Sequence, residues 1–131
     1  MDKRELHKLQ DYLQRIFANN ALKVLPNQAD AERADVSLGE RNIATIAVDD
    51  EDGDRSFSFE MKIPVGRETI ESYLKLLFDN DKFKVVPRVK KTDSVELNLG
   101  SDFLGVVSAD DPKGQSFTLQ MAILDYDLEE I

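Results

Sequence analysis

Residues 56–63 read Ser-Phe-Ser-Phe-Glu-Met-Lys-Ile, and residues 116–123 read Ser-Phe-Thr-Leu-Gln-Met-Ala-Ile. In both segments apolar side chains alternate with polar or small ones. This period of two is typical of a β-strand that buries one face and leaves the other in contact with water. The two segments resemble each other position by position, which indicates that the chain contains the same structural unit twice.

The rest of the chain repeats at a nearly constant spacing. The segment Tyr12–Asn19 recurs as Tyr73–Asn80, and Lys23-Val24-Leu25-Pro26 recurs as Lys84-Val85-Val86-Pro87. A fixed offset with a single deletion is the mark of an internal duplication. We therefore expect repeat one in residues 1–65 and repeat two in residues 66–131, joined in one compact domain, because a repeat of about 60 residues is marginally stable alone.

Each repeat is expected to begin with an amphipathic helix. Asp2 can cap the first helix, with Glu5 as its capping-box partner, and Asn19-Asn20 can end it. The apolar side chains share one helical face, which predicts that this face packs on other elements. These side chains are Leu6, Leu9, Leu13, Ile16 and Phe17 in repeat one, and Ile70, Tyr73, Leu74, Leu77 and Phe78 in repeat two.

Four short strands are expected after each helix. The first ends at Pro26 or Pro87, since proline has no amide donor for a sheet, and a polar loop follows it. The remaining strands are predicted at residues 36–38, 43–48 and 57–63, and at 97–99, 103–109 and 117–123. The short connections favour antiparallel pairing. The predicted fold is α+β: a duplicated helix–four-strand antiparallel unit, with two helices packed on antiparallel sheet and a pseudo-two-fold relation between the repeats.

Composition narrows the range of functions. The chain has 131 residues, no cysteine and a net charge of −9, so disulfides and thiolate metal sites are excluded and nucleic-acid binding is disfavoured. The basic group Lys82, Lys84, Arg88, Lys90 and Lys91 is interpreted as a solvated strand and loop. Without an apolar run of membrane-spanning length or a signal-peptide core, we expect a cytoplasmic protein that does not bind membranes.

Several segments resemble a family of short bacterial proteins, the domain of unknown function 3126. They are the stretch from Asp2 to Leu13, the turn Asp49–Ser56, Phe103–Val107 and Gln120–Asp125. The resemblance covers nearly the whole chain and implies two fused units of the usual length. It also implies a covalent pseudo-dimer, expected to be a monomer or a weak homodimer. No activity comes with the family.

The acidic turn Asp49–Asp54 is the one cluster that could hold a hard cation, which prefers oxygen ligands. Its spacing does not fit an EF-hand, because the first and twelfth loop positions would fall on Val48 and Phe59. A solvated hairpin tip explains the same residues. We therefore assign no metal site, and weak divalent-ion binding stays an alternative.

No catalytic or cofactor-binding residue and no cofactor is predicted. His7 is the single histidine and is expected on the helix surface. The pair Asp110-Asp111 could in principle support acid–base chemistry, but it suits a turn equally well. No phosphate-binding loop or nucleophile motif is present. We expect a protein that is not an enzyme.

Two aromatic residues are candidates for protein contacts. Phe103 occupies the position held by Asn42 in repeat one, and Tyr126 lies in the acidic C-terminal segment, which is either a frayed tail or a short docking segment. The half-polar sheet faces and the edges of the sheet are potential binding surfaces. The sequence therefore favours a non-enzymatic protein-binding or adaptor module with an unidentified protein partner.

Two alternatives remain open. The first is a module that binds a small ligand or a divalent ion, in a pocket between the repeats or at the acidic turn. The second is a role similar to that of secretion chaperones, which are also small, acidic and mixed in secondary structure; this rests on analogy of fold alone.

Overall fold

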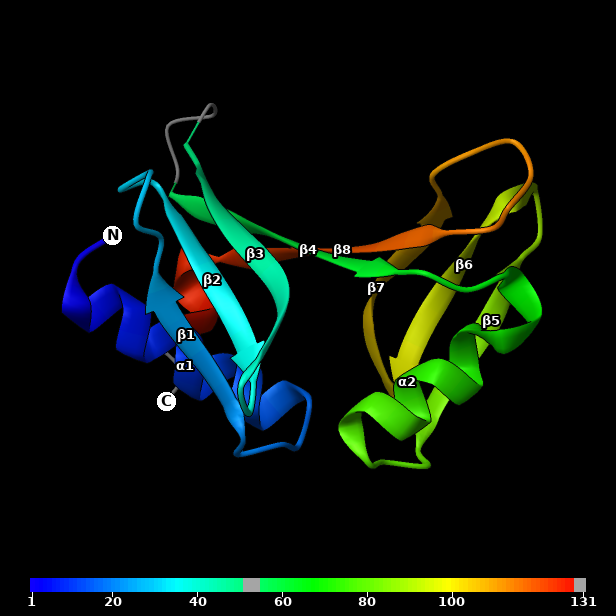
Figure 1. Ribbon diagram of the computed structural model, residues 1–131, viewed down its shortest axis with the longest axis horizontal. Helices are drawn as coiled ribbons and strands as arrows, with labels where there is room; N and C mark the ends of the chain where they lie inside the picture. Colours follow the sequence, from blue (N-terminus) through cyan, green and yellow to red (C-terminus); the bar gives the residue numbers. More distant parts are fainter. Residues whose placement is uncertain (51–54, 129–131) are drawn as a thin grey trace. The chain divides into compact units, whose positions relative to one another are not determined.

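The computed structural model describes residues 1–50 and 55–128 (Figure 1). Helix–strand order repeats along the chain, as expected from the duplication. The elements are α1 (Lys3–Ile16), β1 (Leu22–Pro26), β2 (Arg33–Leu38), β3 (Arg41–Asp49), β4 (Ser56–Ile63), the 3-10 turn η1 (Arg67–Thr69), α2 (Ile70–Phe78), β5 (Phe83–Arg88), β6 (Lys91–Leu99), β7 (Asp102–Ala109), β8 (Phe117–Leu124) and α3 (Asp125–Leu128).

The described ranges contain one eight-stranded sheet in the order β1-β2-β3-β4-β8-β7-β6-β5. The pairs β1–β2, β2–β3, β5–β6, β6–β7 and β7–β8 are antiparallel. The predicted α+β class with antiparallel sheet is thus confirmed. A third helix, α3, joins the two that were expected, where the sequence left a choice between a frayed tail and a docking segment.

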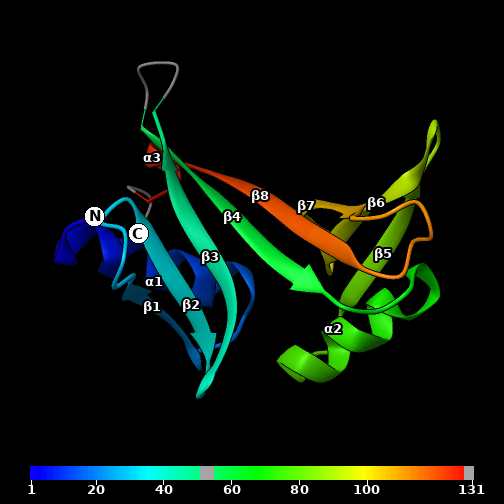
Figure 2. The same cartoon turned by 45° about the horizontal axis from the view of Figure 1, so that its top comes forward.

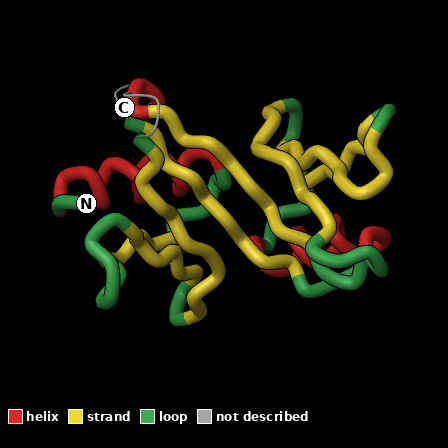
Figure 3. Tube along the Cα trace, turned by 90° about the horizontal axis from the view of Figure 1, so that it is seen from above, coloured by secondary structure: helices red, strands yellow, loops and turns green. Residues whose placement is uncertain are grey.

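The chain divides into two compact units whose boundary does not follow the repeat boundary. Unit 1 contains residues 1–60 and 122–131, and unit 2 contains residues 61–121. The last strand of each repeat therefore begins in its own unit and ends in the other. These two strands, β4 and β8, are neighbours in the strand order and run alongside each other in Figure 3. Folding of the whole chain as one domain stays a prediction.

In unit 1, α1 packs against β1 (Figures 1 and 2). The Asp2 carboxylate accepts a hydrogen bond of 2.8 Å from the Glu5 backbone N–H, which confirms Asp2 as the cap. The carboxylate of Glu5, expected as the capping-box partner, binds Arg55. The predicted end of the helix was two residues late: α1 ends at Ile16, and the left-handed residue is Ala18, with φ 51°. The apolar face of α1 is buried, and the Phe17 ring lies 5.9 Å from that of Phe59 on β4.

In unit 2, α2 packs against β5 in the same way. Ile70, Leu74 and Phe78 are buried, and the Phe78 ring lies 5.3 Å from that of Phe83. The helix ends with Asp79 in the left-handed conformation, with φ 51°. This residue is equivalent to Ala18, so the same helix termination occurs in both repeats.

The meanders β1–β3 and β5–β7 share their irregularities. A register shift lies between Val36 and Ser37 in repeat one and between the equivalent Leu97 and Asn98 in repeat two. The turn glycines Gly39 and Gly100 have positive φ, as the sequence predicted.

The predicted loop after Pro87 was wrong in part. Residues from Lys91 onward belong to β6, because they pair with β5 and β7 although their side chains are polar. Sequence hydropathy could not reveal this pairing, since an exposed strand end carries polar side chains as a loop does.

Candidate functional site

Both residues predicted as protein contacts are exposed. Phe103 is the second residue of β7 in unit 2 and is 59% exposed, and Tyr126 lies on α3 in unit 1 and is 62% exposed. Large aromatic side chains with this exposure leave apolar area in water, which is typical of contact surfaces. The two residues belong to different units, so each is described with its own surroundings.

Phe103 belongs to a face of the β5–β6–β7 meander that we call the outer face. Residues directly opposite one another on neighbouring strands point to the same side of a sheet. One row across the strands is Lys84, Asn98 and Phe103, and the next is Val86, Glu96 and Val106. Phe83, Val95, Leu97 and Val107 lie on the opposite, buried face. The six side chains of the two rows, Lys84, Asn98, Phe103, Val86, Glu96 and Val106, define the outer face.

The outer face combines apolar and charged groups. Val86 is 36% exposed at the start of the Val106 row, and Lys84 is exposed at the start of the Phe103 row. The Asn98 Oδ1 atom is buried and accepts no hydrogen bond from the residues that the structure describes.

The equivalent face of repeat one is more polar. Its rows are Lys23, Ser37 and Asn42, then Leu25, Asp35 and Thr45. Asn42 stands where repeat two has Phe103, and Thr45 stands where it has Val106. In both repeats the edge strand contributes a lysine to the first row and an aliphatic residue, Leu25 or Val86, to the second. The two repeats thus share a scaffold, but repeat two alone carries the aromatic residue.

The sheet edges are less open than the sequence suggested. On β1, the Val24 N–H donates to the Gln10 side chain at 3.0 Å, and the Leu22 carbonyl accepts from the Gln14 amide at 2.9 Å. The next outward position is Pro26, which has no N–H to offer. Helix side chains and a proline therefore block addition of a strand at this point.

The same protection occurs on β5. The Val85 N–H donates to Glu71 Oε1 at 2.9 Å, and Pro87 follows at the next outward position. Because both outer strands have this arrangement, the faces of the sheet are better candidates for partner binding than its edges. Sequence analysis missed the arrangement, although Gln10 and Glu71 occupy equivalent positions in the two repeats and could have indicated it.

The carboxylate pair considered for acid–base chemistry lies at the start of the β7–β8 connection. Asp110 accepts hydrogen bonds from the Thr118 hydroxyl at 2.6 Å and from the Ser116 hydroxyl at 3.0 Å, and Lys62 Nζ lies 3.4 Å away. The Thr118 hydrogen bond is the main cause that lowers the pKa of Asp110, followed by Ser116 and Lys62. A carboxylate held in its ionised form in this way serves as a structural acceptor and is poorly suited to proton transfer at neutral pH.

His7 lies on the exposed side of α1. Its Nε2 atom is 3.3 Å from an Asp11 carboxylate oxygen, and its side chain is 72% exposed. This placement agrees with the surface position that the sequence predicted, and it adds an i,i+4 pair on the helix surface.

Only part of the acidic turn can be described. Asp49 and Asp50 are exposed, and residues 51–54 lie outside the described ranges. Within residues 1–50 and 55–128, no group of three or more His, Cys, Asp or Glu side chains is arranged to hold a metal ion. Weak divalent-ion binding at the turn stays a prediction.

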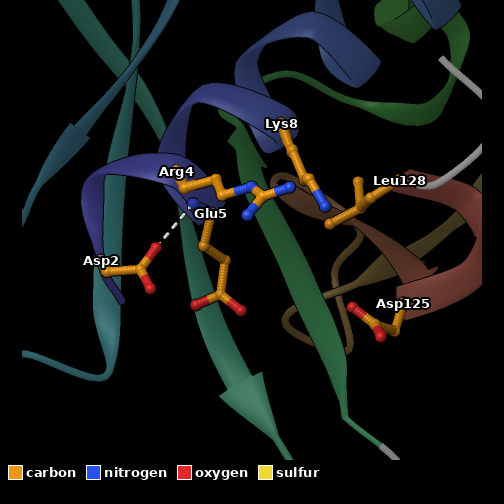
Figure 4. Close-up of a pocket in the computed structure, with 6 residues that line it drawn as sticks. All are labelled: Asp2, Arg4, Glu5, Lys8, Asp125 and Leu128. Carbon is orange, nitrogen blue, oxygen red and sulfur yellow. Dashed lines mark hydrogen bonds between the residues drawn. The ribbon is translucent and has the colours of Figure 1, made fainter.

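A second surface feature lies in unit 1, where α1 and α3 meet (Figure 4). An open depression of about 310 Å³ is lined by Asp2, Arg4, Glu5, Lys8, Asp125 and Leu128. Its charges are mixed, and the Glu5 carboxylate is already held by Arg55 through hydrogen bonds of 2.6 and 2.8 Å. The depression therefore presents no surplus of one charge that would select a particular ligand.

The comparisons with known proteins identify a family and nothing narrower. The model of a family described as "Protein of unknown function (DUF3126)" matches the chain twice, over residues 5–64 and 67–127. No curated protein and no solved structure matches it. Among the helices of the described segments, none is both long and apolar enough to cross a membrane. The two matches confirm the resemblance and the tandem duplication seen in the sequence.

Proposed function

The chain belongs to the DUF3126 family and contains its unit twice, and we propose that it is a non-enzymatic protein-binding module. Because that family is described only as having unknown function, the support for this proposal comes from the surface of the protein. The outer face of β5–β7 is the binding surface. The observation that carries this proposal is Phe103, which is 59% exposed on a strand and lies in a row with Lys84. Aromatic side chains surrounded by polar ones are the usual anchors of protein interfaces.

The comparison between the repeats supports this choice of surface. Asn42 and Thr45 show that the same scaffold accepts polar residues at the positions of Phe103 and Val106. The fold therefore does not need the apolar residues of repeat two, and an exposed Phe gains nothing from solvent. The protected edges of β1 and β5 also favour recognition through side chains over addition of a strand.

The experiment places a photo-crosslinking amino acid, p-benzoylphenylalanine, at position 103 and expresses the tagged chain in its native cell. Matched probes at Asn42 and at Leu76, which is 83% exposed on α2, control for exposure alone. We expect one crosslinked protein that is specific to position 103. Equal crosslinking at all three positions, or none at 103, would contradict the proposal.

A substitution series then tests the surface itself. The variant Phe103→Asn/Val106→Thr gives repeat two the residues of repeat one, and Leu76→Asn is the matched control. We expect the double variant to retain its fold and to capture at least about 10-fold less partner, since an interface anchor contributes about 2 kcal/mol or more. Unchanged capture by the double variant would contradict the proposal.

The first alternative is a small-ligand or divalent-ion module. Its candidate sites are the depression between α1 and α3 and the acidic turn. Thermal stabilisation by millimolar Ca²⁺ or Mg²⁺ that disappears in Asp50→Asn/Asp52→Asn would support ion binding, because a ligand that binds only the folded state raises its stability. Repeating the partner capture with EDTA separates this alternative from the leading proposal. The chaperone-like alternative predicts capture of partially folded clients.

The same proposal includes the architecture and the oligomeric state. We take the repeat unit to be one helix followed by four strands, with the two copies related by a pseudo-two-fold axis and the chain monomeric or a weak homodimer in the cytoplasm. The helix–strand order and the two family matches support this unit. The molar mass in solution, measured by light scattering over a range of concentrations, tests the oligomeric state.

A further inference from the structure

A stripe of basic side chains follows the outer strand of unit 2. Alternate residues of a strand point to the same side, so Lys82, Lys84, Val86 and Arg88 follow one another along the outer side of β5. The turn after β5 then adds Lys90 and Lys91. At a rise of about 3.3 Å per residue, the part of this basic stripe from Lys82 to Arg88 is roughly 20 Å long, and the chain reverses at the turn that follows.

The lysines of the basic stripe form no close ion pairs with described residues, although the pKa of Glu71 is lowered mainly by its Val85 hydrogen bond and also by the charge of Lys84. Lys82, Lys84, Lys90 and Lys91 are exposed, and none forms an ion pair with another residue of the described part of the chain. Arg88 donates to the Ser94 hydroxyl at 3.0 Å, which fixes its side chain on the outer face. In a chain with a net charge of −9, this concentration of positive charge is a local exception.

The β5–β6 turn carries a second anomaly. Arg88 pairs with Lys91, so Val89 and Lys90 form a two-residue turn, which extends beyond the neighbouring strand ends in Figure 2. Neither turn residue has the positive φ that favours Gly or Asn, so the turn accepts a β-branched residue. Val89 is 99% exposed, and this aliphatic side chain is therefore available for contacts and gains nothing from packing.

Repeat one lacks both features. Its loop between β1 and β2 contains Asp30 and Glu32, and Asn27 organises it by accepting from the N–H groups of Ala29 and Asp30 at 2.9 Å. The basic stripe and the exposed Val89 are therefore specific to repeat two. They lie on the same meander as Phe103.

We infer that the partner is recognised through an extended acidic segment, which lies along β5 with carboxylates on the basic stripe and aliphatic side chains against Val86 and Val89. This inference rests on the proposed function and names the chemistry of its partner. Complementary charge sets the orientation and the rate of association, and the valines supply apolar contacts. The residues of the stripe from Lys82 to Arg88 follow one strand, so an extended segment can contact them in succession.

The test uses a fluorescein-labelled Glu–Val peptide of about seven residues, titrated with the full chain and followed by anisotropy. Its odd positions alternate between Glu and Val and its even positions are Ser, so that in an extended chain the carboxylates and the valines face the stripe together. The variant Lys84→Glu/Lys90→Glu/Lys91→Glu reverses the charge of three of the five basic side chains of the stripe. The control Lys23→Glu alters the equivalent of Lys84 in repeat one. Comparison probes are the Lys–Val peptide, a single-stranded DNA of equal charge and vesicles with anionic lipid.

We expect the Glu–Val peptide to bind in low salt, to bind at least about 10-fold more weakly in 0.5 M NaCl, and to lose binding in the triple variant while Lys23→Glu binds normally. Absence of binding, or equal binding by the triple variant, would overturn the inference. Preferential binding of the DNA or of the vesicles would overturn it as well.

The two proposals can fail separately. If crosslinking at position 103 identifies a partner but the Glu–Val peptide does not bind, the binding module stands and the acidic segment is wrong. If the peptide binds but position 103 crosslinks nothing, Phe103 is wrong as the anchor residue and binding is confined to β5. We expect the triple variant to fold, because all three substituted side chains are exposed, and circular dichroism verifies this.

Discussion

Glu71 on α2 accepts a hydrogen bond of 2.9 Å from the backbone N–H of Val85, which lies on the outer strand of the sheet. In repeat one, Gln10 makes the equivalent contact with Val24 at 3.0 Å. Both helices thus satisfy a strand donor that would otherwise be free to pair with another chain. The contact holds the helix of each repeat against its edge strand, and it also protects that edge from pairing with another chain.

The Glu71 contact predicts a pH dependence that Gln10 cannot show. The Val85 hydrogen bond is the main cause that lowers the pKa of Glu71 from its ordinary value of 4.5. A lowered folded-state pKa means that the stabilisation is present above the unfolded-state pKa and is lost as pH falls through the folded-state pKa. We expect Glu71→Gln to preserve stability at pH 7 and to reduce the loss below pH 4.5, as urea unfolding at several pH values would show. Glu71→Ala should cost about 1 kcal/mol at pH 7.

Gly105 on β7 allows close approach of β8. A Cβ added at this position would clash with the Gln120 carbonyl and lie 2.8 Å from Met121 Cγ. We expect Gly105→Ala to lower the free energy of unfolding by about 1–3 kcal/mol, since backbone atoms must move. Repeat one has Ala44 at the equivalent position, so Ala44→Gly is the matched control and should cost about 1 kcal/mol. A Gly105→Ala variant as stable as the original chain, or more stable, in urea unfolding would refute the close-packing explanation.

Arg55 and Glu5 form a two-pronged ion pair that fastens α1 to the start of β4. The distances are 2.6 Å from Nε and 2.8 Å from Nη2, and the Glu5 hydrogen bond is the main cause that raises the pKa of Arg55. Because Arg55 is 38% exposed, solvent screens the pair. A double-mutant cycle with Glu5→Ala and Arg55→Ala should give a coupling energy of about 1 kcal/mol that falls in high salt. A coupling energy of zero would mean that the ion pair between Glu5 and Arg55 does not contribute to stability.

The last described helix, α3, is expected to be a docked segment. Leu128 is 2% exposed, whereas Tyr126 two positions earlier is 62% exposed. We expect Leu128→Ala to destabilise the protein by about 2–3 kcal/mol and Tyr126→Ala to change stability by less than about 0.5 kcal/mol. Thermal unfolding of both variants measures this difference. If both variants changed stability by a similar, small amount, the segment would be a frayed tail and not a docked helix.

Separation of the repeats should destroy both units. Each unit contains the end of the other repeat's last strand, since residues 122–131 belong to unit 1 and residues 61–65 belong to unit 2. We expect fragments 1–65 and 66–131 to be unfolded or aggregated alone and to regain structure when mixed, as circular dichroism and light scattering would show. Two fragments that are each folded and monomeric would disprove a shared fold.

Local sequence patterns accounted for much of this architecture. The Asp2 cap, the buried faces of α1 and α2, the alternation in β4 and β8 and the turns at Gly39 and Gly100 all follow from residues close together in the chain. Helix and strand periods are fixed by backbone geometry, so they can be read from a single sequence. The duplication fixed the number of units in the same manner.

Contacts between distant residues came only from the tertiary structure. Gln10 and Val24, like Glu71 and Val85, are 14 residues apart, and no local pattern joins them. The exposure of Val89, the extension of β6 to Lys91 and the passage of β4 and β8 from one unit into the other depend on strand register. Register is set by the packing of the whole sheet, because backbone hydrogen bonds alone are nearly the same in every register.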